Sequence, residues 1–474
     1  MMRLTHSLCL LGLCFFFFGC SQKIYPERNQ FLPDGTSTPT VDLSAYRSVQ
    51  LRAGQDSSLA VALCISGGGA RAANFGTGIM LGLEEITHQF RDGPADALDE
   101  VDYLSTVSGG GFAGGAYITA RYEHAYYRRS QPFSLAEYVD RQIKDDLARS
   151  YMWPLIRSNL NIFLLFTPID DGDALEKAID NYVMGYIRRR SDDGGRSIVL
   201  GDMFIPAASA KRPTLPYHIT NSATVKGIRI FPFTPDILET YQIDGYSHRM
   251  RREYLGEAFN PYAVPHSVGI KSSGSFPVLI SNTTLRSTYD SERPYLHLMD
   301  GALSDNLGVY TGIDILKQDK ASRKALWVID AENDNNYYTF SKHQSSVWSV
   351  KVAASLPGSG LYANRGILSQ EFRDMTEPFG IELVYFGFSV LLWDNDAQPP
   401  AIINLKEAYP YLINRLRRNP HTLSNKDKQM LYEVLSQIAT KYSIKDEEQE
   451  LLFLAGRLIV HLQKDAVLAS LQKG

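Results

Sequence analysis

Short apolar runs alternate with amphipathic helical patterns through the middle of the chain. Leu59–Ile65 and Val101–Val107 have the length and composition of buried strands, and each is followed by a glycine-rich turn. Behind the first turn, apolar residues recur at spacings of four, four and three, as they do on one face of a helix. Strands that alternate with helices predict an α/β fold of three layers, in which helices cover both faces of a mostly parallel sheet. Further strands are predicted at Tyr217–Thr224, Tyr295–Met299 and Leu326–Ile329.

The pattern changes beyond about residue 335. One strand-like run, Ile381–Leu392, is followed by amphipathic helices at Lys428–Tyr442 and Glu448–Leu462. We therefore expect an α/β domain over residues 59–335 and a mainly helical C-terminal extension over residues 336–474. Within the first domain, residues 147–202 have the character of an insertion, and a helical cap over the core and a lid beside a binding site both fit its aromatic and apolar composition.

The N-terminus carries a leader-like segment. Leu8–Phe18 is an apolar run of 11 residues, which is too short to span a bilayer as a helix and is typical of a signal-peptide core. The run ends in Phe17-Phe18-Gly19-Cys20, which resembles a bacterial lipobox, the motif whose cysteine is lipidated and becomes the mature N-terminus. An uncleaved or conventionally cleaved leader is the alternative.

A lipidated Cys20 would fix the location of the protein. Acyl chains on its thiol and amino groups supply the two or more anchors that stable membrane binding needs. Ser21, rather than an aspartate, resembles the outer-membrane sorting preference of bacterial lipoproteins. We expect a signal peptide at residues 1–19, a polar tether at residues 20–58, and a lipid-anchored protein in the bacterial cell envelope that faces the periplasm from the outer membrane.

Composition narrows the function classes. The 474 residues include 48 Lys and Arg against 52 Asp and Glu, a net charge of −4, so the chain has no overall basic field to hold nucleic acid. Three of the four cysteines lie in the first twenty residues and only Cys64 lies in the body, which argues against a disulfide framework or a structural zinc site. The ten histidines show no metal-binding spacing, and we expect no metal or cofactor.

Gly67-Gly68-Gly69-Ala70-Arg71 stands between the first predicted strand and its helix. Successive glycines allow a tight turn and present bare N–H groups at a helix N-terminus, where partial positive charge favours an anion. No Gly-Lys-Ser/Thr follows, so a nucleotide-binding P-loop is disfavoured. Arg71 suits either a structural role in the turn or attraction of a phosphate.

Thr106-Val107-Ser108-Gly109-Gly110 occupies the second strand-to-helix junction. A serine at such a sharp turn has an exposed hydroxyl, and its neighbours are small because the turn is crowded. The usual pattern of this elbow is Gly-x-Ser-x-Gly, and Thr106 replaces its first glycine. Further along the chain, Asp300-Gly301-Ala302 follows a predicted strand, so that the aspartate can project toward the other two turns.

Together, in this order, the three motifs resemble those of the patatin-like phospholipase family, over about residues 59–333. The resemblance implies a three-layer patatin-like fold and a catalytic dyad of Ser108 and Asp300 that works without histidine. It also implies an oxyanion hole at Gly67, Gly68 and Gly69, supported by Arg71 and by the small residues Gly109, Gly110 and Gly301. The implied substrates are membrane phospholipids or related acyl esters. The blocks Leu200–Phe204 and Ser272–Pro277 resemble further family motifs.

Two other functions remain open from the sequence. A Ser-Asp-His hydrolase is one, because His343 or His421 would follow Ser108 and Asp300 in the order that many hydrolases use. A lipoprotein that keeps the fold as a non-catalytic scaffold is the other, although the intact motifs argue against decay of the site.

Overall fold

The computed structural model describes the chain in segments that leave out both termini. The described residues leave out the predicted leader, Cys20, residues 20–57 of the predicted tether, His343 and the predicted domain boundary near residue 335, so those assignments stay predictions. The described residues are 58–91, 93–127, 132–151, 171–185, 197–203, 215–246, 259–277, 279–332, 372–393, 395 and 403–472.

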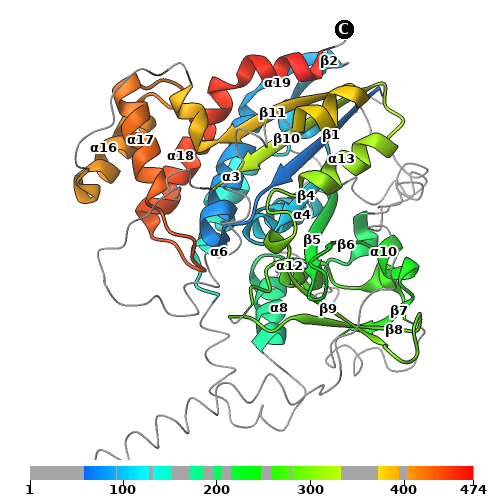
Figure 1. Ribbon diagram of the computed structural model, residues 1–474. Coiled ribbons are helices and arrows are strands. Elements are labelled where there is room, and N and C mark those ends of the chain that lie inside the picture. Colours follow the sequence, from blue (N-terminus) through cyan, green and yellow to red (C-terminus); the bar gives the residue numbers. More distant parts are fainter. Residues whose placement is uncertain are drawn as a thin grey trace, which may run out of the picture.

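A nine-stranded sheet in the order β11-β10-β1-β4-β5-β9-β8-β7 forms the centre of the described structure, with β6 paired to β5 (Figure 1). The five strands from β11 to β5 are parallel, and the remaining strands pair antiparallel. The parallel strands are β1 (Leu59–Ile65), β4 (Val101–Val107), β5 (Tyr217–Thr224), β10 (Arg323–Asp330) and β11 (Ile381–Gly387). The antiparallel strands are β6 (Ile230–Phe233), β7 (Ile243–Tyr246), β8 (Thr283–Ser287) and β9 (Tyr295–Asp300).

Helices cover both faces of this sheet, as the alternating pattern predicts. Helices α3 (Gly69–Glu85) and α4 (Gly109–Tyr127) lie on one face, with α12 (His266–Ser273) against α4, whereas α13 (Val309–Gln318) lies on the other. The remaining helices are α5 (Leu135–Tyr138), α6 (Lys144–Ala148), α8 (Asp171–Tyr182), α10 (Pro235–Thr240), α16 (Leu405–Arg418), α17 (Asn425–Ser436), α18 (Asp446–Leu462) and α19 (Lys464–Leu471), and a separate hairpin joins β2 (Thr87–Arg91) to β3 (Gly93–Asp96).

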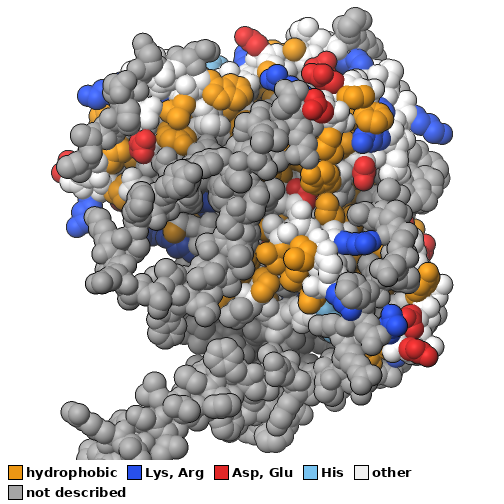
Figure 2. Space-filling model, viewed as in Figure 1, with side chains coloured by type: hydrophobic (Ala, Val, Ile, Leu, Met, Phe, Trp, Pro, Cys, Tyr) orange, Lys and Arg blue, Asp and Glu red, His pale blue; other side chains and the backbone are white. Residues whose placement is uncertain are grey.

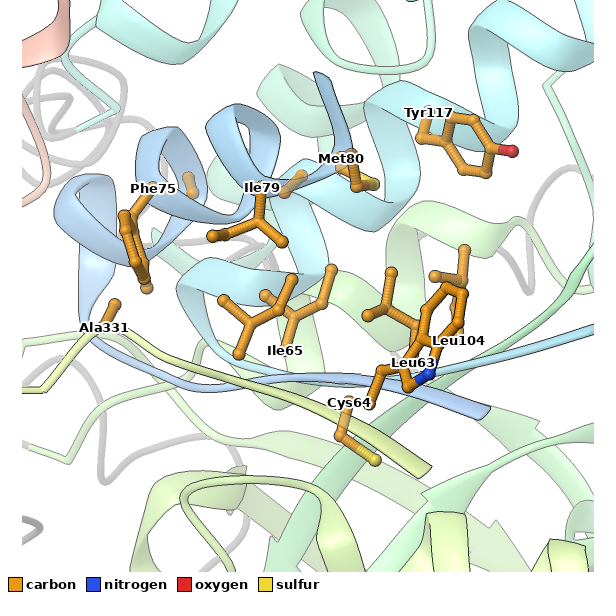
Figure 3. Close-up of a cluster of buried hydrophobic side chains, with 14 of the residues drawn as sticks. Leu63, Cys64, Ile65, Phe75, Ile79, Met80, Leu104, Tyr117 and Ala331 are labelled. Atoms are coloured by element: carbon orange, nitrogen blue, oxygen red, sulfur yellow. The ribbon is translucent and has the colours of Figure 1, made fainter. Parts of the chain in front are cut away.

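The core forms where β1 packs between the helical layers. All seven residues of β1 are buried, because parallel strands covered on both faces expose neither set of side chains. Side chains alternate along the strand: Ile65 points toward Phe75 and Ile79 of α3, whereas Cys64 points to the opposite face (Figure 3). There the Cys64 thiol donates to the Gly308 carbonyl just before α13. Cys64 is thus a buried core residue, and burial raises the pKa of its thiol.

The C-terminal region is built into this core. Helix α18 packs along α3, and the two helices approach so closely that a Cβ at Gly456 would come within 2.5 Å of the Gly78 carbonyl carbon. Strand β11 pairs parallel with β10 and extends the central sheet. At the same time α16 and α17 stand at one side of the molecule (Figure 1). The helical C-terminal region therefore both completes the sheet and covers it.

Comparison with the predicted elements gives one correction of type. The run Ile381–Leu392 is not one strand: the strand ends at Gly387, and Phe388–Leu392 forms a 3₁₀ helix. An apolar run alone does not separate the two, because both bury their side chains. Strands β1, β4 and β5 have the predicted bounds, whereas β6, β7 and β8 were not predicted.

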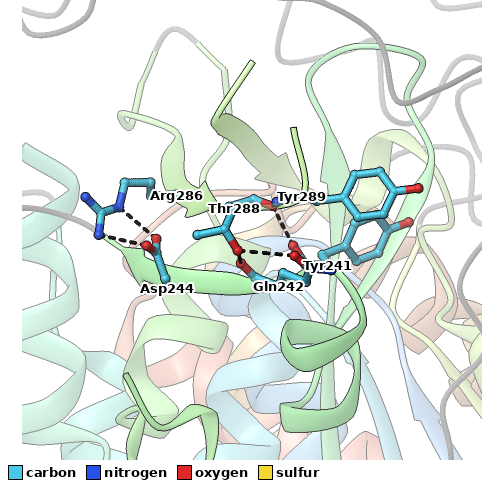
Figure 4. Close-up of polar contacts among 7 residues, drawn as sticks. Tyr241, Gln242, Asp244, Arg286, Thr288 and Tyr289 are labelled. Atoms are coloured by element: carbon cyan, nitrogen blue, oxygen red, sulfur yellow. Dashed lines mark hydrogen bonds and ion pairs between the residues drawn. The ribbon is translucent and has the colours of Figure 1, made fainter. Parts of the chain in front are cut away.

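The antiparallel edge of the sheet is held by polar contacts. Arg286 on β8 makes two hydrogen bonds to the Asp244 carboxylate on β7, at 2.7 and 2.8 Å (Figure 4). Next to them, the Thr288 hydroxyl lies 3.2 Å from the Gln242 side-chain oxygen.

The face shown in Figure 2 carries side chains of both charges interspersed with hydrophobic ones. In the described segments, no helix has the length and apolar character needed to cross a membrane.

Candidate active site

Ser108 lies at the sharp turn between β4 and α4. Its φ of 48° places it in the left-handed region, which a residue with a side chain adopts only when its surroundings enforce it. The backbone is crowded there: a Cβ at Gly109 would overlap the Gly69 carbonyl, and a Cβ at Gly110 would lie 2.5 Å from the Ile65 oxygen. The predicted small neighbours are therefore required by the close approach of the end of β1 and of the glycine turn that follows it.

Thr106, the departure from the usual elbow pattern, is accommodated by β5. Its hydroxyl lies 2.7 Å from His218 Nε2, and His218 Nδ1 in turn lies 2.8 Å from His266 Nε2. Burial lowers the pKa of both imidazoles, that of His266 to about 4, so both rings are neutral near pH 7. The Thr106 side chain thus has a hydrogen-bonding partner on β5, and Ser108 keeps the backbone conformation of the tight turn.

Asp300 lies at the end of β9 and contacts Ser108 directly. The Ser108 hydroxyl donates a 2.7 Å hydrogen bond to Oδ2 of Asp300, and the Ala302 N–H donates to Oδ1 at 2.9 Å. Burial raises the Asp300 pKa from 3.8 to about 6, against the opposing effect of these two hydrogen bonds. A Cβ at Gly301 would overlap the Asn221 carbonyl, so glycine is required immediately after the aspartate.

The glycine-rich turn lies beside this pair. A Cβ at Gly67 would lie 3.4 Å from Ser108 Cβ, and Gly68 and Gly69 have φ angles of 133° and 60° at the start of α3. The Gly67 N–H donates to the Asn306 carbonyl at 2.9 Å. Of the three predicted oxyanion donors, the N–H groups of Gly68 and Gly69 are therefore the ones left for a ligand. They lie at a helix N-terminus, where an anion is favoured.

Arg71 connects this turn to the C-terminal region. Its guanidinium is buried and donates to the Ile438 carbonyl at 2.7 Å. The Ala70 N–H donates to the Lys441 carbonyl at 2.7 Å, and a Cβ at Gly69 would collide with the same carbonyl. Of the two roles that the sequence allowed, these contacts favour the structural one. Ile438 and Lys441 carry no sequence signal for this role, since each acts through its backbone across more than 360 positions.

His421, one of the two candidate histidines of the alternative triad, contacts other groups. His421 Nε2 is 3.1 Å from Glu85 at the end of α3, and its ring stacks on His461 with centroids 4.3 Å apart. The Asp300 carboxylate instead interacts with Ser108 and the Ala302 N–H. Across the described segments, no group of three His, Cys, Asp or Glu side chains is arranged to hold a metal ion.

The raised pKa of Asp300 has a consequence for stability. Because the folded protein holds this proton more tightly than the unfolded chain does, Asp300 weakens the fold as pH rises from about 4 through about 6. Asp300→Asn removes the ionisation, and its amide oxygen can still accept from Ala302. We expect the free energy of unfolding of Asp300→Asn, relative to wild type, to grow by about 2–3 kcal/mol between pH 4 and 7.

Denaturant titrations of both proteins across this pH range measure the difference, in which the other titrating groups largely cancel. A difference that does not change with pH would show that Asp300 has an ordinary carboxyl pKa in the folded protein.

Several solved structures and one family model are similar to this chain. Human GIVD cytosolic phospholipase A2 is 12% identical, with a TM-score of 0.45 over 96% of this chain and 62% of its own, so this chain spans less than two thirds of that protein. VipD from Legionella pneumophila is 12% identical, with a TM-score of 0.25 over 88% of this chain and 86% of its own. A search of curated proteins gave no match. Residues 63–313, more than half of the chain, match the patatin-like phospholipase family model, and this range includes Gly67–Gly69, Ser108 and Asp300. The chain therefore belongs to the patatin-like phospholipase family.

Proposed function

We propose that this protein is a lipid acyl hydrolase in which Ser108 is the nucleophile and Asp300 the general base. The observation that carries the proposal is the 2.7 Å hydrogen bond from the Ser108 hydroxyl to the buried Asp300 carboxylate. A nucleophile and a base within hydrogen-bond reach, at a tight strand-to-helix turn, are what acyl transfer requires. Family membership supports lipid esters as the substrate class.

In the first half of the proposed reaction, Ser108 Oγ attacks the ester carbonyl carbon while its proton passes to Asp300. A carboxylate with a pKa of about 6 is ionised at neutral pH, yet it is a stronger base than an ordinary aspartate. The ester carbonyl oxygen then carries negative charge, and the Gly68 and Gly69 N–H groups are placed to stabilise it. The proton on Asp300 next passes to the leaving alcohol, and the acyl group remains on Ser108.

In the second half, water replaces the alcohol. Asp300 accepts a proton from the water as its oxygen attacks the acyl-enzyme, and the same proton returns to Ser108 Oγ when the fatty acid leaves. The bond broken is the Ser108 ester and the bond formed is the carboxylic acid C–O bond. These steps use one hydroxyl, one carboxylate and backbone N–H groups, so the scheme calls for no metal or cofactor.

The proposed substrates are phospholipids or related acyl esters of a bacterial envelope. The family supports a lipid substrate, and the lipobox-like sequence at Cys20 supports attachment to a membrane, most simply the periplasmic face of the outer membrane. A lipid-anchored enzyme would meet these esters at the surface to which it is attached.

Activity measurements on the purified protein test the dyad. We expect Ser108→Ala and Asp300→Asn each to lower kcat for a chromogenic short-chain ester by about a thousandfold or more, because the nucleophile and the base act during chemistry. His421→Ala and His343→Ala should stay within about threefold of wild type. A fluorophosphonate probe should label wild type at Ser108, as located by peptide mapping.

Other outcomes identify the alternatives. A comparable loss in one histidine variant with an intact circular dichroism spectrum would indicate a triad. Full activity in Ser108→Ala would show that another residue is the nucleophile. A correctly folded wild type with no esterase or lipase activity would favour the non-catalytic scaffold.

Lipidation at Cys20 is tested by fractionation. We expect wild type to pellet with outer membranes and to carry acyl groups by mass spectrometry, whereas Cys20→Ser should lose the acyl mass and appear in the soluble fraction. Ser108 and Asp300 are remote in sequence from Cys20, so the released variant should keep its esterase activity. Unchanged pelleting with no acyl mass on either protein would contradict the anchor.

A further inference from the structure

Two neighbouring serines of α12, Ser272 and Ser273, are fully buried, and their hydroxyls have different partners. Ser272 accepts a 2.9 Å hydrogen bond from the Ser222 hydroxyl on β5 and joins helix to sheet. Ser273 lies one position further along and contacts the candidate site instead. Both are serines of the same helix with the same burial. Comparing variants at the two positions therefore distinguishes a general packing role from a role specific to the site.

The Ser273 hydroxyl bridges the nucleophile turn and the sheet. It accepts a 2.8 Å hydrogen bond from the Ser108 N–H and donates one of 2.5 Å to the Asn221 carbonyl on β5. The hydroxyl thus donates its one hydrogen and accepts through one lone pair, and its position is fixed from two sides. The Ser108 backbone, which has the unfavourable φ of 48°, is tied through this one oxygen to the strand that separates β4 from β9.

The same short segment also holds the base. The Asp300 N–H donates to the Ser275 carbonyl at 2.9 Å, two residues beyond Ser273. The backbone N–H groups of Ser108 and Asp300 therefore both end on residues 273–275, although the two catalytic candidates are 192 positions apart. A change in the position of Ser273 relative to Ser275 would therefore change the separation of the hydroxyl and the carboxylate.

We infer that Ser273 is a positioning residue for the reaction, and this inference rests on the proposed function. Its hydroxyl holds the Ser108 backbone in the left-handed conformation that directs Oγ at Asp300. Removing that oxygen leaves the partly buried Ser108 N–H without this acceptor, and the turn is then free to relax toward ordinary backbone angles. Displacements of about 1 Å at a reacting group are enough to slow chemistry by about a hundredfold.

Ser273→Ala tests this inference, with Ser272→Ala as the matched control. We expect Ser273→Ala to lower kcat for a soluble ester by about tenfold to a hundredfold, with KM within about threefold of wild type. The rate of Ser108 labelling by a fluorophosphonate should fall by a similar factor, because labelling also depends on the aligned hydroxyl. Ser273→Cys, whose thiol is a weak donor and acceptor, should have a kcat and a labelling rate between those of wild type and Ser273→Ala. Ser272→Ala should keep kcat and the labelling rate within about threefold.

The controls separate the possible failures. Melting temperatures measured for all the variants show whether the fold is intact, and we expect similar, small losses in Ser272→Ala and Ser273→Ala, since each removes one buried hydroxyl. Ser273→Ala with wild-type kcat and labelling would overturn the inference, as would an equal loss of kcat in Ser272→Ala. If Ser108→Ala is inactive in the same assay, either result leaves the proposed function standing; if Ser108→Ala is fully active, the proposed function itself has failed.

Discussion

The hydrogen bond between the Ser108 hydroxyl and the buried Asp300 carboxylate is the contact on which the rest of the site depends. A carboxylate withdrawn from water is costly to ionise, and this cost is what raises its pKa to about 6 and makes it a better base. Burial of this carboxylate therefore lowers the stability of the folded protein and makes Asp300 a better base. The surrounding contacts, from the Ala302 N–H to the crowded glycines, keep the two oxygens together despite that cost.

The sheet brings the pair together through its register. In β4 and β5, Val107 is paired with Asn221, and in β5 and β9 Ser222 is paired with Asp300, so the nucleophile and the base lie at the same level with β5 between them. Strands β1 and β4 are parallel, so the turns that follow them meet at one edge. The Gly67–Gly69 turn consequently lies against Ser108, although the two turns are far apart in the sequence. The loop after α17 then supports this turn from outside through the Lys441 carbonyl.

The sequence predicted the local parts of this arrangement. Strands β1, β4 and β5 follow from their apolar runs, and the turns at Gly67–Gly69 and Ser108 follow from glycine after a strand. The antiparallel strands β6, β7 and β8 were missed, because runs of four or five residues are too short to show an alternation, and Pro232 within β6 also argues against a strand. Partners that act through backbone or across long separations, such as Asn306 on Gly67 and Ser273 on Ser108, also could not be predicted. Their roles depend on strand order and register, which no single-chain pattern specifies.

The pH dependence of kcat/KM tests the central claim most directly, because its acid limb reports the essential base of the free enzyme. With a soluble ester and circular dichroism at each pH to monitor the fold, the account predicts that kcat/KM falls tenfold per pH unit below about pH 6, where Asp300 becomes protonated. Activity that stays constant down to about pH 4 while the fold is intact would contradict the claim that Asp300, buried against Ser108, is the base.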